Sequence, residues 1–267
     1  MSQESDYFQK NKASWNQRTS LHLKSEFYDI PAFLAGKNSL QSIEMGLLGD
    51  VAGKSVLHLQ CHFGQDTLSL ARLGALPTGV DLSDKAIGEA EKLAEQLALP
   101  VKFICCNVYD LPDHLDEQFD IVFTSYGTIG WLPDLDRWAD VVQRFLKPGG
   151  RFVFVEFHPV VWMFDDDFSY VKYRYFNSDP IIETTEGTYA DPKADVKLES
   201  IGWNHALGEV LSSLLANNLE ITHFQEYDYS PYNCLSHMER IGACKYRIKH
   251  LENKIPMVYS LTARKRG

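Results

Sequence analysis

The sequence has no long apolar run, no paired cysteine motif and no surplus of basic residues. None of its 267 residues lies in an apolar stretch near the roughly 20 residues that a membrane span needs, and residues 1–20 lack the apolar core of a signal peptide. We therefore expect a cytoplasmic protein without a membrane partner. Its five cysteines form no Cys-x-x-Cys pair, so we expect free thiols and no metal site.

The charge balance also narrows the class of partner. Asp and Glu outnumber Lys and Arg by 36 to 26, whereas nucleic-acid-binding domains usually carry a basic surplus. Hydrophobic residues make up 45% of the chain, which is an ordinary share for a globular protein. These numbers favour a folded domain that binds a small molecule over one that binds nucleic acid, and they leave the oligomeric state open.

Strand patterns and helix patterns alternate along most of the chain. Short apolar runs predict strands at residues 55–59, 78–81, 101–105, 119–124, 151–157, 221–227 and 257–265. Apolar residues at helical spacing predict helices at residues 65–73, 84–97, 135–146 and 207–217. This alternation predicts an α/β fold, with a seven-stranded, mostly parallel sheet and helices on both faces.

The alternation breaks after His158. Residues 159–204 are rich in aromatic residues and Asp, and they contain hairpin-like stretches at 170–176 and 181–189. In open α/β sheets, ligands bind outside the carboxyl ends of the strands. We therefore interpret this insertion as a lid over that edge of the sheet.

Three polar features follow the first three predicted strands. A tight turn at residues 60–64 lies between strand and helix, where backbone N–H groups can face a ligand, although an ordinary connecting turn would show the same pattern. Asp81 ends the second strand, where an acid can bind both hydroxyls of a ribose or cap the next helix. Asn107 follows the third strand, and its amide suits the edge of an adenine ring.

In this order, these segments resemble the class I S-adenosylmethionine-dependent methyltransferases of the small-molecule type. The segments that carry the resemblance are VLHLQCHFG at 56–64, GVDLSDKAI at 79–87, CCNVYDLP at 105–112, FDIVFTSYGTIGWL at 119–132 and LKPGGRFVFVEFHP at 146–159. The resemblance covers residues 51–157 closely and the last two strands loosely. It implies a Rossmann-like fold, S-adenosyl-L-methionine as cofactor and S-adenosyl-L-homocysteine as product.

The resemblance also assigns candidate roles to residues. The expected cofactor-binding set is Gln60, Cys61, His62, Gly64, Asp81, Leu82, Asn107, Val108, Tyr109, Ser125, Tyr126 and Tyr28. The expected catalytic residues are Tyr126 and His158, with His158 as a possible base, and the expected acceptor pocket contains Trp131, Tyr189, Trp203 and His205. Arg18, together with Tyr28, is a candidate for binding the cofactor carboxylate. For the aromatic residues and for the histidines, simple packing remains the alternative.

The resemblance divides the chain into four segments of one domain. Residues 1–50 form an N-terminal helical cap, 51–157 the cofactor-binding half, 158–205 the lid insertion and 206–267 the completion of the sheet. The expected reaction is in-line transfer of a methyl group to an O, N or C nucleophile of a small molecule. Thr124–Gly127 stands where nucleic-acid amino-methylating enzymes carry Asn-Pro-Pro-Tyr, which supports a small-molecule acceptor.

The sequence departs from the family pattern in the first loop. His58 replaces the usual acid, and Gln60 and His62 replace glycines. These changes motivate an alternative, a non-catalytic sensor or scaffold that binds S-adenosylmethionine or S-adenosylhomocysteine. A nicotinamide-dependent dehydrogenase would share the sheet and the ribose acid, but it needs a Gly-x-Gly-x-x-Gly loop that the sequence lacks.

Overall fold

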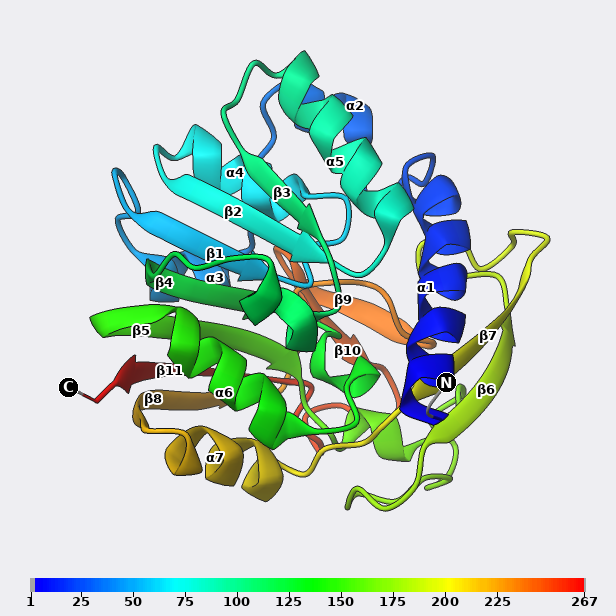
Figure 1. The fold of residues 1–267 in the computed structure, drawn as a ribbon. Helices are drawn as coiled ribbons and strands as arrows, with labels where there is room; N and C mark the ends of the chain where they lie inside the picture. Colours follow the sequence, from blue (N-terminus) through cyan, green and yellow to red (C-terminus); the bar gives the residue numbers. More distant parts are fainter. Residues whose placement is uncertain (1–2, 267) are drawn as a thin grey trace.

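The computed structural model describes residues 3–266 and is built around a twisted seven-stranded sheet (Figure 1). Its strands lie in the order β3-β2-β1-β4-β5-β11-β8, and β11 runs antiparallel to both of its neighbours. The strands are β1 (Ser55–Leu59), β2 (Leu76–Asp81), β3 (Lys102–Cys105), β4 (Phe119–Ser125), β5 (Leu146–Phe157), β8 (Leu219–Tyr227) and β11 (Val258–Lys265). The predicted fold class is confirmed.

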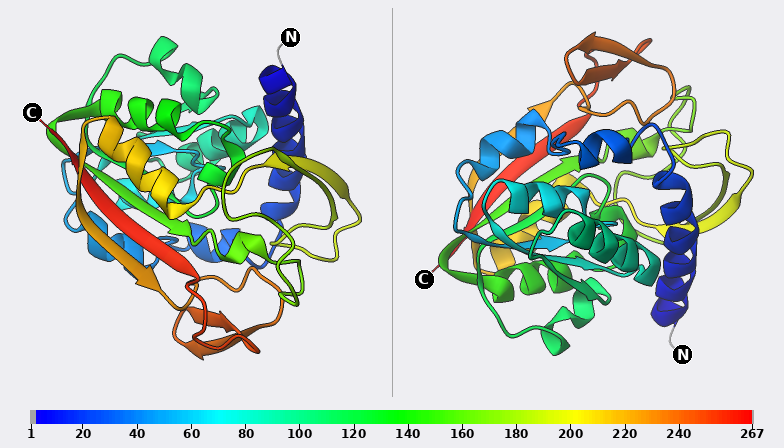
Figure 2. Two further views of the ribbon diagram at one scale, coloured as in Figure 1. Left: turned by 90° about the horizontal axis from the view of Figure 1, so that it is seen from below. Right: turned by 90° about the horizontal axis from the view of Figure 1, so that it is seen from above.

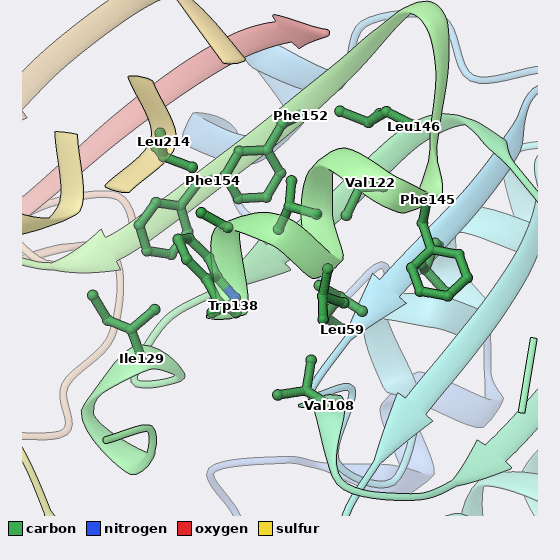
Figure 3. Close-up of a cluster of buried hydrophobic side chains, with 14 of the residues drawn as sticks. Leu59, Val108, Val122, Ile129, Trp138, Phe145, Leu146, Phe152, Phe154 and Leu214 are labelled. Carbon is green, nitrogen blue, oxygen red and sulfur yellow. The ribbon is translucent and has the colours of Figure 1, made fainter. Parts of the chain in front are cut away.

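Helices cover both faces of this sheet, as the two views of Figure 2 show. One face carries α3 (Ser42–Leu48), α4 (Gln65–Arg72) and α5 (Asp84–Gln96), and the other carries η1 (Val108–Asp113), α6 (Leu135–Phe145) and α7 (Leu207–Ala216). Successive side chains of β5 pack on opposite faces of the sheet. Phe152 and Phe154 pack against Trp138 of α6 (Figure 3), whereas Val153 packs on the opposite face. Burial on both faces explains why the central strands are apolar without alternation.

The N-terminal helix and the insertion meet beside the sheet. Helix α1 (Gln3–His22) lies along a hairpin of β6 (Ile181–Glu186) and β7 (Lys197–Gly202) in Figure 1. The Asn11 side chain donates to the Ile201 carbonyl at 2.8 Å and accepts from the Ile201 N–H at 2.9 Å. The hydroxyls of Tyr28 and Tyr189 add a second link between the N-terminal segment, which continues into α2 (Ile30–Leu34), and the insertion.

Two local predictions differ from the structure, and one hairpin was missed. Residues 170–176 form no strand, because β6 pairs with β7 and not with that stretch, which makes one isolated bridge at Val171. Strand β5 begins at Leu146 and not at Arg151, with an irregular register against β4. The hairpin of β9 (Met238–Gly242) and β10 (Lys245–Ile248) between β8 and β11 was not predicted.

Membrane-spanning helices and metal-binding clusters were both sought within the described residues. No helix within residues 3–266 is long and apolar enough to cross a membrane. All five cysteines are free, and Cys61 and Cys106 are buried. In that same range, no three His, Cys, Asp or Glu side chains are grouped so that they could hold a metal ion.

Replacing Asn11 by Ala should destabilise the fold. The substitution leaves the Ile201 N–H and carbonyl without partners in a residue that is 0% exposed, and each such loss costs about 1–3 kcal/mol. We expect the free energy of unfolding, measured with urea, to fall by about 2 kcal/mol. Lys10→Ala is the matched control, because the neighbouring Lys10–Glu199 ion pair is exposed. An equal loss in both variants would contradict the role given to Asn11.

Candidate functional site

A cavity of about 1480 Å³ lies where the parallel strands end. Loops that follow β1, β2, β3 and β4 form its floor, and α1, the β6–β7 hairpin and residues 232–236 form its walls. Small-molecule pockets usually measure roughly 300–1,000 Å³, so this cavity has room for a cofactor together with a second molecule. The short loops of a parallel sheet thus gather distant parts of the sequence into one site.

In the loop after β1, two residues that are not glycine adopt the left-handed backbone conformation that glycine favours. Gln60 and His62 have left-handed φ values of 54° and 52°, and Gly64 has a φ of 79°. A Cβ atom on Gly64 would lie 2.8 Å from the Phe103 ring, so this position requires glycine. The backbone path therefore survives the substitutions at 60 and 62, while their side chains add new polar groups to the cavity.

These two side chains carry polar atoms without partners. Gln60 donates from Nε2 to the Thr128 carbonyl at 2.8 Å, but its Oε1 has no partner within the described residues. The His62 Nε2 lies 2.9 Å from the His22 Nδ1, and the His62 Nδ1 is buried without a partner. Burial, and then the charge of Arg18, lowers the pKa of His22 to about 3. Burial and the neighbouring His22 and Arg18 also lower the pKa of His62, so both rings are neutral.

Asp81 and Asn107 face the cavity at the ends of β2 and β3. The Asp81 carboxylate accepts from the backbone N–H groups of His62 and Ser83, each at 2.8 Å. Burial raises the pKa of Asp81 to about 6, against the effect of these donors. The two carboxylate oxygens together have more lone pairs than these donors occupy, which leaves acceptor capacity for a ligand hydroxyl. Asn107 caps η1 by accepting from the Tyr109 N–H at 3.1 Å, which leaves its amide N–H₂ group for a ligand.

Arg18 supplies a positive charge that the protein itself does not neutralise. Its side chain is 7% exposed and lines the cavity, with the guanidinium 5.6 Å from the Trp15 ring and 5.8 Å from the Trp131 ring. Its one side-chain hydrogen bond, to the Ser14 hydroxyl, measures 3.4 Å, and no carboxylate of residues 3–266 forms an ion pair with it. A buried charge without a counter-ion is costly, which points to an anionic ligand group.

The cavity also brings together the aromatic residues predicted for an acceptor pocket. Trp131, Tyr189, Trp203 and His205 line it, as do Tyr28, Ser125 and Tyr126 and the predicted residues Cys61, Leu82 and Val108. Both ring nitrogens of His205 are engaged, with Glu209 at 2.9 Å and with the Leu132 carbonyl at 2.8 Å. This pairing favours a structural role for His205 over a catalytic one.

Two predicted site residues lie outside the cavity. Tyr109 packs in the core beneath α6, and its hydroxyl bonds to the backbone of Asp134, so it is not placed to bind a cofactor. His158 is 3% exposed, and its Nε2 lies 2.9 Å from the Glu226 Oε1 on β8. Burial lowers the pKa of His158, against the opposing effect of Glu226. Its ring turns to the edge of the sheet, and the assignment of His158 as base is therefore corrected.

The sequence reading missed a group of buried carboxylates near Tyr126. Asp66, in the first turn of α4, is half-buried and lines the cavity, and the nearby Ser39 and Ser125 hydroxyls lower its pKa against the effect of burial. Glu44 of α3 lies behind the wall and accepts from the Tyr126 hydroxyl at 2.8 Å. Glu44 also completes a capping box with Gln41, and a capping box gives no sign of chemistry in a sequence.

Glu156 is a third buried acid, and it holds the loop after β4 in place. Its carboxylate accepts from the N–H groups of Gly127, Thr128 and Ile129, and the Thr128 hydroxyl also donates to it. Burial raises the pKa of Glu156, while these amides favour its charged form. The loop that carries Tyr126 and Trp131 is thereby fixed in one conformation.

Comparison with known proteins identifies the domain. Residues 57–154 match a family model described as a methyltransferase domain. A SAM-dependent methyltransferase of Methanosarcina mazei superposes with a TM-score of 0.57 at 21% identity, over 85% of this chain and 98% of that one. Residues 57–154 thus belong to a methyltransferase domain, and the fold is that of SAM-dependent methyltransferases. The predicted family resemblance is confirmed.

Two curated relatives each align with about half of this chain. An uncharacterized methyltransferase of Synechocystis sp. is 34% identical over 133 residues, which cover 49% of this chain and 60% of that protein. A ubiquinone biosynthesis O-methyltransferase of Coxiella burnetii is 32% identical over 124 residues, which cover 46% of this chain and 51% of that protein. The chain thus spans little more than half the length of these relatives.

The buried histidines of the methyltransferase domain should make its stability depend on pH. His58 bonds through Nδ1 to the Thr67 hydroxyl, and burial lowers the pKa of His58 to about 3. The unfolded chain gains this proton below about pH 6.5, so the stability is lost as the pH falls from about 6.5 toward 3. His58→Asn should reduce the slope of unfolding free energy against pH by about 1.4 kcal/mol per unit.

Urea denaturation at pH 4.5, 5.5 and 7.5 measures this slope. His114→Asn is the control, because the His114 side chain is exposed. An unchanged slope in His58→Asn would show that the folded protein protonates this ring.

Proposed function

We propose that this protein transfers a methyl group from S-adenosylmethionine to a small-molecule acceptor. The observation that carries the proposal is the cavity at the carboxyl edge of the sheet, which holds Asp81 and the unpaired Arg18 in its lining. Asp81 would accept from the ribose hydroxyls, and Arg18 would pair with the carboxylate of the amino-acid end.

Methyl transfer needs little from the protein beyond a correctly oriented acceptor and the exclusion of water. When bound, the sulfonium of the cofactor supplies an activated methyl group. The aromatic wall of Trp131, Tyr189 and Trp203 would hold the acceptor in line with it and exclude water. The relatives named as methyltransferases support this reading. We place the reaction in the cytoplasm, with a small molecule and not a nucleic acid as acceptor.

The departures in the first loop do not favour a non-catalytic role. Gln60 and His62 adopt the left-handed backbone that glycines would supply, so the path of the loop around a ligand is kept. Both residues line the cavity, and each has a buried polar atom without a partner among the described residues. The geometry thus supports binding with altered contacts.

Asp81→Ala should weaken binding of S-adenosylhomocysteine at least tenfold in titration calorimetry. The change removes both carboxylate oxygens that face the ribose position, and charge-assisted hydrogen bonds of this kind are worth about 1.5–3 kcal/mol. Arg18→Met should weaken binding by a similar factor, since it keeps the packing between Trp15 and Trp131 but removes the charge.

Asp120→Asn is the control, because Asp120 pairs with Lys147 away from the cavity. Folded wild-type protein that binds neither S-adenosylmethionine nor S-adenosylhomocysteine would refute the proposal. Transfer of labelled methyl from the cofactor to a molecule in a metabolite extract then separates an enzyme from a sensor.

A further inference from the structure

Tyr126 connects the cavity to a carboxylate behind its wall. It follows β4 with a left-handed φ of 39°, and its N–H donates to the Val155 carbonyl at 2.7 Å. Its ring lines the cavity and packs against Phe157 and Tyr232 at centroid distances of 5.8 and 5.0 Å. From there its hydroxyl donates to the Glu44 Oε2 at 2.8 Å.

Glu44 is suited to take up a proton. It is 0% exposed, it is not part of the cavity lining, and no Lys, Arg or His of residues 3–266 forms an ion pair with it. Its Oε1 accepts from the Gln41 N–H, which leaves Tyr126 as the donor to Oε2. Burial, and then the charge of Asp66, raises the pKa of Glu44 to about 7.

We propose that Tyr126 and Glu44 form a proton relay that receives the proton lost by the methyl acceptor. The inference rests on the proposed function and adds a substrate class: a nucleophile that bears a proton, such as a hydroxyl, a thiol or an ammonium group. Tyr126 is the catalytic residue of the relay, because it lines the cavity in which the acceptor would lie. Glu44 is a positioning residue that acts through Tyr126.

The step balances in atoms and charge. The Tyr126 oxygen takes the proton from the acceptor while the Tyr126 proton passes to the Glu44 Oε2. The acceptor lone pair forms the bond to the methyl carbon, and the electrons of the methyl–sulfur bond remain on sulfur. One positive charge on sulfur and one negative charge on Glu44 disappear together, and Tyr126 is neutral before and after the step.

Asp66 is the competing base, since it lines the same cavity. Hydrogen bonds from Ser39 and Ser125 favour its charged form, although burial raises its pKa. A carboxylate held ionised in this way acts as a fixed charge that drives a nearby proton onto Glu44. The relay and direct proton transfer to Asp66 predict different effects of substitution, so the experiment decides between them.

The test uses the full chain saturated with S-adenosylhomocysteine and 4-nitrophenol as an acceptor mimic, whose ionised form absorbs visible light. In wild-type protein we expect the pKa of the bound phenol to rise, with an ionisation constant at least tenfold below that of the free phenol, because the phenol and the Glu44 carboxylate share one proton through Tyr126. Glu44→Gln and Tyr126→Phe should each abolish this rise, and the double variant should show no further loss, because both residues serve one path. Glu226→Gln and Tyr227→Phe are matched controls outside the cavity and should keep the rise.

The other outcomes overturn the relay. A rise that survives in Glu44→Gln or Tyr126→Phe, or one lost in Asp66→Asn while both of these keep it, contradicts the proposal. Absence of the rise in wild-type protein with 4-nitrophenol and with 4-nitrothiophenol also contradicts it. If Glu44→Gln fails to fold, Tyr126→Phe alone decides the result. Binding of S-adenosylhomocysteine, measured first by calorimetry, reports separately on the proposed function.

Discussion

The parallel sheet imposes the constraint on which the rest of the molecule depends. Strands β1 to β5 run in one direction, so their carboxyl ends share one edge and their loops meet there. Both faces are buried by helices, which leaves that edge as the place where polar loop residues can face a ligand. The cavity, its charges and its aromatic walls all follow from this arrangement.

The charged residues around the cavity come from segments that lie far apart in the sequence. Arg18 comes from α1, Asp81 from the end of β2, and Asp66 from the start of α4. Arg18 is buried and the two acids are half-buried, and none has an ion-pair partner among the described residues, so each carries a desolvation cost that a ligand can offset. Unpaired charged groups of this kind are typical of sites that bind a charged ligand. They distinguish this cavity from an empty space left by imperfect core packing.

The sequence predicted the parts of the site that lie close to the strands. Asp81, Asn107 and the residues 60–64 were found because each follows a recognisable apolar strand, and the cavity lining contains them. His158 also follows a strand, but its ring turns to Glu226, because direction at a strand end depends on the local turn and not on position. Glu44 was missed because a capping acid and a proton-accepting acid look alike in a sequence. The β9–β10 hairpin was missed because residues 238–248 show no apolar alternation.

The contact between the N-terminal segment and the insertion has a kinetic consequence. The Asn11–Ile201 and Tyr28–Tyr189 bonds join two segments that lie far apart in the sequence, and Asn11, Tyr28 and Tyr189 line the cavity. A ligand that enters or leaves past these contacts must break them, and in many enzymes the opening of such contacts limits product release. The turnover rate of such a protein would then depend more on how fast these contacts open than on how fast the chemical step proceeds.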